Sequence, residues 1–361
     1  MKREFAKVVR VRDRNIGAGA PCFVAAEVGI NHNGELSLAK EMVHAAAEAG
    51  ADSVKFQNYR TDDFLSDRSL TYTYKSQGRE VTEPQWDMFK RCELKPGWVG
   101  ELKQECDRAG VIFFSTPTSE DGVRELVEAG AALLKNGSDY LTHAPLLEFM
   151  GTTGIPIVIS TGMADQQDVD DALAAVGRGG KSDVVLLHCT SSYPTEAEDT
   201  NLSRMVTLRE RYRVPVGFSD HTEGWVAGVQ AVTLGASFFE KHFTLDRNLA
   251  GPDHWFSSTP DELRELVRNL RAAETRLGSA SLQPAGSEAG SRRDYRLSIV
   301  AARDLREGEV LTREMVAYRR PGTGLPPREL EQLLGRRLRT GVLKGTPLQS
   351  DHFICAEGVA R

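Results

Sequence analysis

Short apolar runs alternate with longer segments of mixed polarity from residue 22 to residue 277. The runs are typical of buried strands. The segments between them repeat apolar residues at spacings of three and four, which is typical of amphipathic helices. The runs predict strands at Cys22–Glu27, Asp52–Gln57, Val111–Thr116, Ala131–Lys135, Pro156–Ser160, Asp183–His188, Pro215–Ser219 and Ser237–Lys241. The segments predict helices at Leu36–Ala49, Pro96–Ala109, Glu120–Glu128, Pro145–Thr153, Asp165–Val176, Asp199–Tyr212, Trp225–Leu234 and Pro260–Leu277.

Eight strands that are each followed by a helix are the signature of a closed (β/α)8 TIM barrel. An open doubly wound sheet normally has fewer strands, and its first turn carries a GxGxxG pattern. The first turn here, EVGINHNG at residues 27–34, lacks that pattern. The predicted fold class is therefore α/β, a (β/α)8 TIM barrel followed by a small C-terminal module.

The segment from Thr61 to Glu93 departs from this alternation. It follows the second predicted strand and contains SLTYTYKSQGREVTEPQWDMF, which is long for a connection between a strand and a helix. Long excursions on this side of a barrel often form part of the active site or a lid. A surface loop without a function is an equally good interpretation of the sequence.

The character of the chain changes after residue 278. Residues 279–291, SASLQPAGSEAGS, are poor in apolar residues and typical of a flexible linker. We therefore expect a barrel at 1–278, a linker at 279–293 and a small module at 294–361. The module contains short strand-like or turn-like pieces at Ser298–Ala301, Glu309–Leu311, Met315–Arg319 and Thr340–Leu343. Its roughly 70 residues offer only a marginal core, so we expect it to dock on another surface.

Composition and charge predict a soluble, cytoplasmic protein. Of the 361 residues, 40% are hydrophobic and 27% are charged, and the net charge is −6. Lys and Arg are scattered, so neither nucleic acid nor a membrane surface is an expected partner. The N-terminal sequence MKREFAKVVRVRDR is too polar for a signal peptide, and the chain has no run of about 18 apolar residues that could span a bilayer.

The five cysteines are odd in number and form no CxxC pair; they are Cys22, Cys92, Cys106, Cys189 and Cys355. We interpret them as reduced thiols rather than as disulfides or zinc ligands. Cys189 follows His188 and could be taken for a nucleophile beside a base. Because no orienting group is visible, a buried cysteine at a strand end is the preferred interpretation.

Two histidines follow neighbouring predicted strands. The first strand ends in SDH at residues 219–221, and the next ends in EKH at residues 240–242. The ends of parallel strands lie side by side on one face of a barrel, so His221 and His242 can converge on one divalent metal. Two ordinary polar residues at strand ends are the alternative.

The other predicted strand ends are also polar. They supply Glu27, Lys55, Gln57, Ser115, Thr116, Lys135, Gly137, Ser138, Ser160, Thr161, Gly162, His188, Thr190, Ser191, Ser219 and Glu240. Two lysines and several hydroxyls on one rim predict a site for phosphate or carboxylate, and hence a small phosphorylated substrate beside the metal. For Ser160 a helix N-cap is the alternative, and for the lysines it is a surface lysine with a packed stem.

Ten segments in order along the chain resemble the N-acetylneuraminate synthase family, the sialic acid synthases. They are AEVGINHNG, SVKFQ, FFSTP, LLKNGS, ISTGM, LLHCTSSYP, GFSDHT, EKHFTLDR, GPDH and RPGTGL, from about residue 20 onward. The C-terminal tail is similar to type III antifreeze protein, the SAF type of domain. The resemblance implies a metal-dependent barrel that condenses phosphoenolpyruvate with an N-acylated mannosamine-type sugar. The implied products are a nine-carbon 2-keto acid and phosphate.

The resemblance also implies roles for single residues. His221 and His242 match the metal ligands, with Mn²⁺ as the expected ion and Mg²⁺ or Co²⁺ as alternatives. Glu27 matches an acidic residue near the metal and the reacting carbons, and it forms the catalytic set with the histidines and two lysines. The matches for phosphoenolpyruvate binding are Lys55, Thr116, Lys135, Ser138, Ser160, Ser191 and Ser219. The matches for sugar binding are Gln57, Tyr193, Asp253 and Arg320, the last delivered by the partner in a domain-swapped homodimer.

Two positions depart from the family pattern. Tyr140 stands where the bacterial enzymes have an acidic group that helps to place the sugar, and Ser191 stands where asparagine is usual. The sugar therefore stays open, with legionaminic- or pseudaminic-type precursors and rarer aldoses as alternatives to N-acetylmannosamine. A synthase that uses a phosphorylated aldose and makes a shorter keto acid is less favoured, because no arginine pair lies at a strand end. A non-catalytic sugar-binding barrel is disfavoured because both lysines and both histidines are present.

Overall fold

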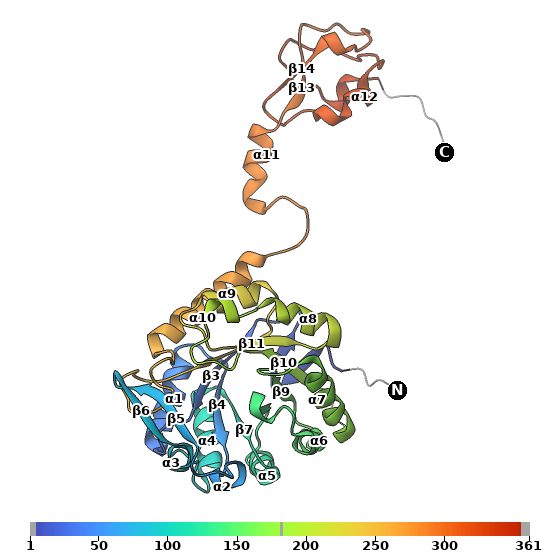
Figure 1. Ribbon diagram of the computed structural model, residues 1–361. Helices are drawn as coiled ribbons and strands as arrows, with labels where there is room; N and C mark the ends of the chain where they lie inside the picture. The colour runs from blue at the N-terminus through green and yellow to red at the C-terminus, as the bar shows by residue number, and fades with distance from the viewer. Residues whose placement is uncertain (1–4, 181–182, 355–361) are drawn as a thin grey trace. The chain divides into compact units, whose positions relative to one another are not determined.

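The computed structural model describes residues 5–180 and 183–354. Contacts divide the chain into two compact units, Met1–Gly278 and Ser279–Arg361, which hold the barrel and the C-terminal module (Figure 1). Cys355 lies outside the described residues, and the other four cysteines are buried free thiols. Among the helices of the described ranges, none is long and apolar enough to cross a membrane.

Eight parallel strands close into a barrel in the first unit. Their order around the barrel is β10, β11, β12, β3, β4, β7, β8 and β9, so strands that follow one another in this part of the chain are neighbours. They are β3 (Phe23–Gly29), β4 (Ser53–Asn58), β7 (Ile112–Pro117), β8 (Leu134–Asn136), β9 (Ile157–Ser160), β10 (Val184–His188), β11 (Val216–Asp220) and β12 (Phe238–His242). The predicted fold class is confirmed, and each predicted strand is present with its ends displaced by at most a few residues.

Helices surround the barrel in Figure 1. They are α1 (Leu36–Glu48), α4 (Trp98–Ala109), α5 (Glu120–Glu128), α6 (Ala144–Thr152), α7 (Gln166–Gly179), α8 (Ser203–Tyr212), α9 (Val226–Thr233) and α10 (Pro260–Leu277), with the 3₁₀ helices η1 (Ser138–Tyr140) and η2 (Ala197–Asp199) among them. Strand residues such as Val54 and Phe56 share one buried cluster with helix residues such as Met42 and Leu102. Burial of this apolar surface is the main favourable term in folding, and it holds the strand ends in fixed positions.

An N-terminal hairpin closes one end of the barrel, and the sequence pattern did not predict it. It consists of the antiparallel strands β1 (Val8–Val11) and β2 (Arg14–Gly17). Its Val9, Val11 and Ile16 share a buried cluster with inward-facing residues near the strand starts, including Phe23 and Phe238. Apolar side chains therefore fill this end of the barrel interior, and the polar residues at the carboxyl ends remain to line a cavity.

The excursion after β4 folds into defined elements. They are α2 (Thr61–Phe64), the hairpin of β5 (Thr71–Ser76) and β6 (Arg79–Pro84), and α3 (Gln85–Arg91). The hairpin lies at the left edge of the barrel unit in Figure 1. The rings of Tyr59, Phe64 and Phe89 pack edge to face, with centroids 5.1–5.6 Å apart. This aromatic cluster attaches α2 and α3 to the segment that follows β4.

The C-terminal unit has a small core of its own. Its elements are η3 (Gly286–Glu288), α11 (Ala289–Tyr295), β13 (Ser298–Ala301), η4 (Arg313–Met315), β14 (Val316–Arg319), η5 (Pro327–Glu329), α12 (Leu330–Leu333) and η6 (Ser350–His352). The antiparallel pair β13 and β14 packs with a buried cluster that includes Ile299, Leu338 and Phe353. Within the expected linker at 279–293, helix α11 begins at Ala289, so this stretch is helical in part.

Candidate active site

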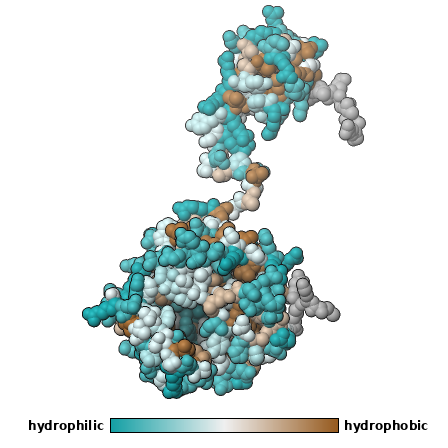
Figure 2. Space-filling view, in the orientation of Figure 1, coloured by the Kyte–Doolittle hydropathy of each residue, from teal (hydrophilic) through white to brown (hydrophobic). Residues whose placement is uncertain are grey.

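The carboxyl ends of all eight barrel strands line one cavity of about 380 Å³. The strands contribute Glu27, Lys55, Thr116, Lys135, Ser160, Ser219 and Glu240, and Cys189 directly follows β10. The face of the barrel unit that Figure 2 presents is hollowed. Other predicted site residues in the lining are Gln57, Ser138, Ser191, Tyr193, His221, His242 and Asp253. The structure therefore brings together every residue that the resemblance assigned to the site except Arg320, which belongs to the second unit. Five residues of the predicted polar rim do not line the cavity: Ser115, Thr161, Gly162, His188 and Thr190.

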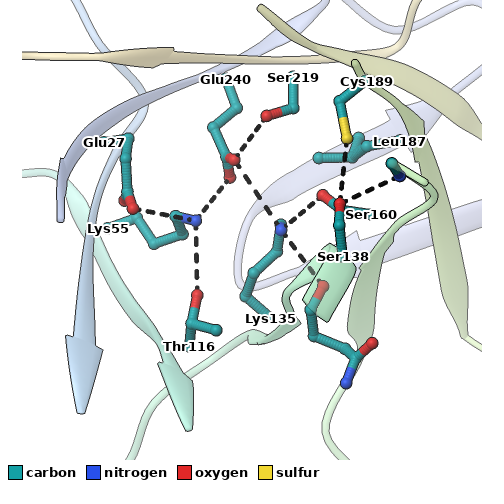
Figure 3. A network of polar contacts seen from close by, with 12 residues as sticks. Glu27, Lys55, Thr116, Lys135, Ser138, Ser160, Leu187, Cys189, Ser219 and Glu240 are labelled. Atoms are coloured by element: carbon teal, nitrogen blue, oxygen red, sulfur yellow. Dashed lines mark hydrogen bonds and ion pairs between the residues drawn. The ribbon is translucent and has the colours of Figure 1, made fainter. Parts of the chain in front are cut away.

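Two buried lysines form the centre of a charged cluster in this cavity (Figure 3). The Nζ atom of Lys55 lies 3.2 Å from Glu27 Oε1 and 3.3 Å from Glu240 Oε2. It also donates a hydrogen bond to Thr116 Oγ1 at 3.4 Å. Glu27 and Lys55 meet because β3 and β4 pair in a register that sets these two residues side by side. Two carboxylates and one hydroxyl therefore surround the ammonium group of Lys55.

Lys135 has one donor left for a ligand. Its Nζ donates to Ser160 Oγ at 2.6 Å and to the carbonyl oxygen of Asn136 at 3.3 Å. The nearest carboxylate oxygen, Glu240 Oε1, lies 3.9 Å away, which is too long for a hydrogen bond. That same oxygen instead accepts the Ser219 hydroxyl at 2.9 Å. Lys135 therefore has one N–H that a bound anion can accept.

Two hydroxyls and a backbone N–H converge near the loop after β9. The N–H of Gly162 donates to Ser138 Oγ at 3.0 Å. A Cβ at Gly162 would lie 2.4 Å from Ser191 Oγ and 2.7 Å from Ser138 Oγ, so any larger residue would collide with both hydroxyls. Such a concave arrangement of small polar donors suits phosphate oxygens.

The four charged groups of the cluster perturb one another. Burial raises the pKa of Glu27 to about 7. Burial acts in the same direction on Glu240, but Lys135 and Lys55 outweigh it and hold the pKa of Glu240 below its usual value. Burial lowers the pKa of Lys135. Burial also acts to lower the pKa of Lys55, but the negative charges of Glu240 and Glu27 outweigh it, so the pKa of Lys55 is raised. Near pH 7 Glu27 is only partly ionised, so the two ammonium groups are incompletely neutralised and can attract an anion.

The two histidines present nitrogen lone pairs in the same cavity. His221 Nδ1 lies 2.7 Å from the carbonyl oxygen of Thr190; a carbonyl only accepts, so Nδ1 carries the proton and Nε2 keeps its lone pair. Among the described residues, the buried His242 Nδ1 has no hydrogen-bond partner, and the two ring centroids are 5.5 Å apart. Burial lowers the pKa of His221 to about 4 and takes that of His242 well below its usual value. Both rings are therefore neutral near pH 7, the form that binds metal ions.

These histidines fit a divalent metal that keeps open coordination positions. The orphaned Nδ1 of His242 and the oriented ring of His221 supply two ligand nitrogens. Within residues 5–180 and 183–354, no group of three His, Cys, Asp or Glu side chains is arranged to hold an ion. Water and substrate oxygens would therefore complete the coordination sphere, as they do in catalytic metal sites.

The residues predicted to contact the sugar lie close to the histidines. Gln57 Nε2 donates to Glu27 Oε1 at 3.0 Å, and the Tyr193 ring centroid lies 4.2 Å from that of His221. Asp253 Oδ2 lies 3.7 Å from His242 Nδ1, and burial raises the pKa of Asp253 to about 7. This side of the site therefore combines an aromatic ring, an amide and a carboxyl group, which suits a polyhydroxylated ligand.

The excursion after β4 contributes to the cavity wall. Tyr72 from β5 and Gln85, Met88 and Phe89 from α3 all line the cavity. Between the two interpretations of this segment, the structure favours a part of the site over a detached surface loop.

Two details of the site differ from what the sequence suggested. The first is Glu240, which contacts both lysines although the sequence analysis gave it no role of its own. Residues two apart in a strand face the same side, so the prediction that His242 faces the cavity also implied that Glu240 does. Tyr140 is not among the cavity-lining residues, whereas its neighbour Asp139 is. The Tyr140 ring instead stacks on His143, with centroids 5.8 Å apart. The departure at Tyr140 therefore does not alter the cavity wall directly.

Comparison with known proteins shows the family of this chain. The sequence profile of the NeuB family matches residues 42–281, and that of the SAF domain matches residues 296–354. The chain belongs to the NeuB family. It is 39% identical over 341 residues to N,N'-diacetyllegionaminic acid synthase of Legionella pneumophila, which covers 93% of this chain and 96% of that protein.

Other relatives with named products differ in the sugar acid. The chain is 31% identical over 345 residues to pseudaminic acid synthase of Campylobacter jejuni, covering 94% of this chain and 98% of that protein. The chain also superposes on a crystal structure of N-acetylneuraminic acid (sialic acid) synthetase from Leptospira borgpetersenii in complex with citrate, with a TM-score of 0.72. The two sequences are 31% identical, and the match covers 80% of this chain and 96% of that one. This NeuB-family chain is therefore an enzyme of the nonulosonic acid synthase type, and its relatives do not agree on one sugar.

Proposed function

We propose that this NeuB-family enzyme condenses phosphoenolpyruvate with an N-acylated mannosamine-type aldose to give a nine-carbon 2-keto sugar acid and phosphate. The observation that supports this most directly is the lysine pair. Lys135 keeps one free N–H, and Lys55 stays protonated between two carboxylates. Two cations with hydroxyls around them suit the phosphate and carboxylate groups of one small anion.

We assign the lining residues to two substrates. Phosphoenolpyruvate is bound by Lys55, Thr116, Lys135, Ser138, Ser160, Ser191 and Ser219, which all line the cavity. The aldose is bound by Gln57, Tyr193 and Asp253 from the same cavity, with Arg320 from a second chain. The cationic cluster and the histidine side are adjacent in one cavity, so the two substrates can meet there at reacting distance.

The reaction forms a bond between C3 of phosphoenolpyruvate and the aldehyde carbon of the open-chain sugar. The electron pair of the enol double bond forms this bond, the aldehyde oxygen takes a proton, and C2 becomes electron-poor. Water adds at C2, and the tetrahedral intermediate loses phosphate to give the keto acid. We assign the proton of this water to Glu27. Its Oε2 has no hydrogen-bond partner in the part of the chain that the structure describes, and a pKa raised to about 7 suits a general base.

Lys55 and Lys135 hold the phosphate group and stabilise the negative charge that it carries away. Both are less than 5% exposed, and charges interact more strongly in such surroundings than in water. Glu240, which accepts a hydrogen bond from Ser219 and lies beside both lysines, offsets the repulsion between the two ammonium groups. The lysines are therefore oriented before the substrate arrives.

His221 and His242 are the residues that would hold a divalent ion, with Mn²⁺ expected and Mg²⁺ or Co²⁺ as alternatives. When bound, such an ion supplies Lewis-acid polarisation of the sugar's carbonyl oxygen. Two protein nitrogens with open positions for water and substrate oxygens favour a harder ion than zinc.

A panel of aldoses tests the proposal and identifies the sugar. N-acetylmannosamine and the precursors of legionaminic and pseudaminic acid are the candidates, since synthases for the corresponding products are relatives of this chain. The assay measures phosphate release from phosphoenolpyruvate with each aldose and identifies the keto acid by mass. Absence of phosphate release with every aldose would refute the proposal, and a shorter keto acid would favour another synthase class.

We place the reaction in the cytoplasm, because the four described cysteines are free thiols.

We also propose a homodimer in which the module at 294–361 completes the partner's catalytic barrel at 1–278 through Arg320. Residues 1–278 contain 31 Lys and Arg against 41 Asp and Glu, a net charge of −10, whereas residues 279–361 contain 14 against 10, a net charge of +4. Opposite net charges favour the approach of one chain's module to another chain's barrel. A two-fold dimer would then contain two equal sites.

A further inference from the structure

The loop that carries Asp253 is held by residues outside the cavity lining. This loop, residues 244–257, follows β12 and is called the Asp253 loop here. Asn31, in the turn after β3, donates from Nδ2 to Ser257 Oγ at 3.0 Å. Ser257 Oγ in turn donates to the carbonyl oxygen of Asp253 at 2.5 Å. Asn31 and Ser257 are completely buried, so this chain of hydrogen bonds fixes one side of the loop.

The tip of the β5–β6 hairpin holds the same loop from another direction. Ser76 Oγ accepts the backbone N–H of Gly251 at 3.2 Å. Gln77 Nε2 donates to the carbonyl oxygen of Asn248 at 3.1 Å. Ser76 is 8% exposed, so water competes little for its hydrogen bond.

Gly251 lies between the hairpin tip and Asn33 of the turn after β3. Its φ of +150° is rarely adopted by residues with a side chain, and a Cβ there would lie 2.9 Å from Asn33 Oδ1 and 2.8 Å from His254 Cδ2. Asn33 Nδ2 also donates to the carbonyl oxygen of Ala250 at 2.8 Å. The backbone just before Asp253 is therefore enclosed by the turn after β3 and by the hairpin.

These attachments concern only the sugar side of the cavity. The Asp253 loop supplies Pro252 and Asp253 to the lining, and the hairpin supplies Tyr72. In the part of the chain that the structure describes, no hydrogen bond or ion pair joins the hairpin or this loop to Lys55 or Lys135. A change at the hairpin tip can therefore move Asp253 without disturbing the lysine cluster.

We infer that Ser76, at the hairpin tip, is a positioning residue that fixes Gly251 and so holds the Asp253 carboxylate where the aldose binds. The inference rests on the proposed function, because it takes the ligand of Asp253 to be the aldose. It gives the excursion after β4 a specific task, which is to set affinity for the aldose and not for phosphoenolpyruvate.

The test compares three variants of the full-length protein. Ser76→Ala removes the hydrogen-bond acceptor, Ser76→Thr keeps it, and Thr73→Ala is the matched control. Thr73 is on the same hairpin, where its hydroxyl forms a hydrogen bond with that of Thr82, at 2.8 Å on the exposed face. Loss of one hydrogen bond predicts that Ser76→Ala raises the KM for the aldose about fivefold, while the KM for phosphoenolpyruvate stays unchanged. Ser76→Thr is expected to restore the wild-type value, and Thr73→Ala is expected to leave both KM values unchanged.

Amide hydrogen exchange of residues 247–257 tests the attachment without any turnover. Ser76→Ala should speed exchange there, whereas Thr73→Ala and Ser76→Thr should not. Unchanged exchange in Ser76→Ala would overturn the inference, as would faster exchange with an unchanged KM for the aldose, or an equal rise in both KM values. If the wild-type protein used no aldose, the proposed function and with it the aldose role of Ser76 would fail, and the exchange result would still decide the attachment itself.

Discussion

Replacement of Lys135 by methionine probes the anion site with little change in side-chain shape. Methionine keeps the length and apolar stem of lysine and removes the ammonium group. Within the protein, the ammonium group donates hydrogen bonds to Ser160 Oγ and to the carbonyl oxygen of Asn136. The substitution therefore removes the one N–H that remains for phosphoenolpyruvate, and it leaves Lys55 as the neighbour of both carboxylates.

The structure sets the size of the expected effect. One hydrogen bond to a charged group contributes about 1.5–3 kcal/mol, which corresponds to a rise of about 10- to 150-fold in the Kd for phosphoenolpyruvate. Lys55→Met should also weaken phosphoenolpyruvate binding, but it should lower stability more than Lys135→Met does, because Lys55 forms ion pairs with both Glu27 and Glu240. Its removal leaves Glu27 and Glu240 without their nearest cation, and breaking a buried pair costs about 3–5 kcal/mol of the free energy of unfolding.

Calorimetric titration with phosphoenolpyruvate measures the affinity, and thermal unfolding measures the stability of both variants. We expect Lys135→Met to lose affinity with a smaller fall in Tm than Lys55→Met, and to keep its KM for the aldose. A folded Lys135→Met protein that binds phosphoenolpyruvate like the wild type would refute the assignment of the free N–H. Equal losses for both substrates would show that the substitution distorts the whole cavity.

Three further outcomes are expected. A chelator should abolish activity and Mn²⁺ restore it, and His221→Ala should lose bound metal by elemental analysis; full turnover of metal-free protein would contradict this assignment. A general base acts when it is ionised, and the pKa of Glu27 is raised to about 7, so kcat/KM should rise with pH through about 7. The Glu27→Gln variant should not show this rise, and its rate should be about 10²–10⁴-fold lower. Inactive His221→Ala and Arg320→Ala chains should regain activity after subunit exchange, since one site of each mixed dimer carries neither defect. Absence of recovery after demonstrated exchange would mean that Arg320 does not act in the partner's site.

The alternation of apolar runs and amphipathic segments was enough to predict the barrel. Parallel strands that are buried on both faces appear in a sequence as short continuous apolar runs, and their spacing leaves room for a helix after each one. The abrupt change to polar residues at the strand ends also placed Lys55, Lys135, His221 and His242 on one rim, because parallel strands present these ends to the same face. The cavity contains all four residues.

Contacts between distant parts of the chain were decided only by the tertiary structure. The pairing of Glu240 with Lys55 and Lys135 joins three strands, and Ser76 meets Gly251 across 175 positions of sequence. The N-terminal hairpin, although short, fills one end of the barrel through Val9 and Ile16. A local pattern shows which face of a strand or helix is apolar, but the partner of a side chain depends on register and packing between segments that the sequence separates.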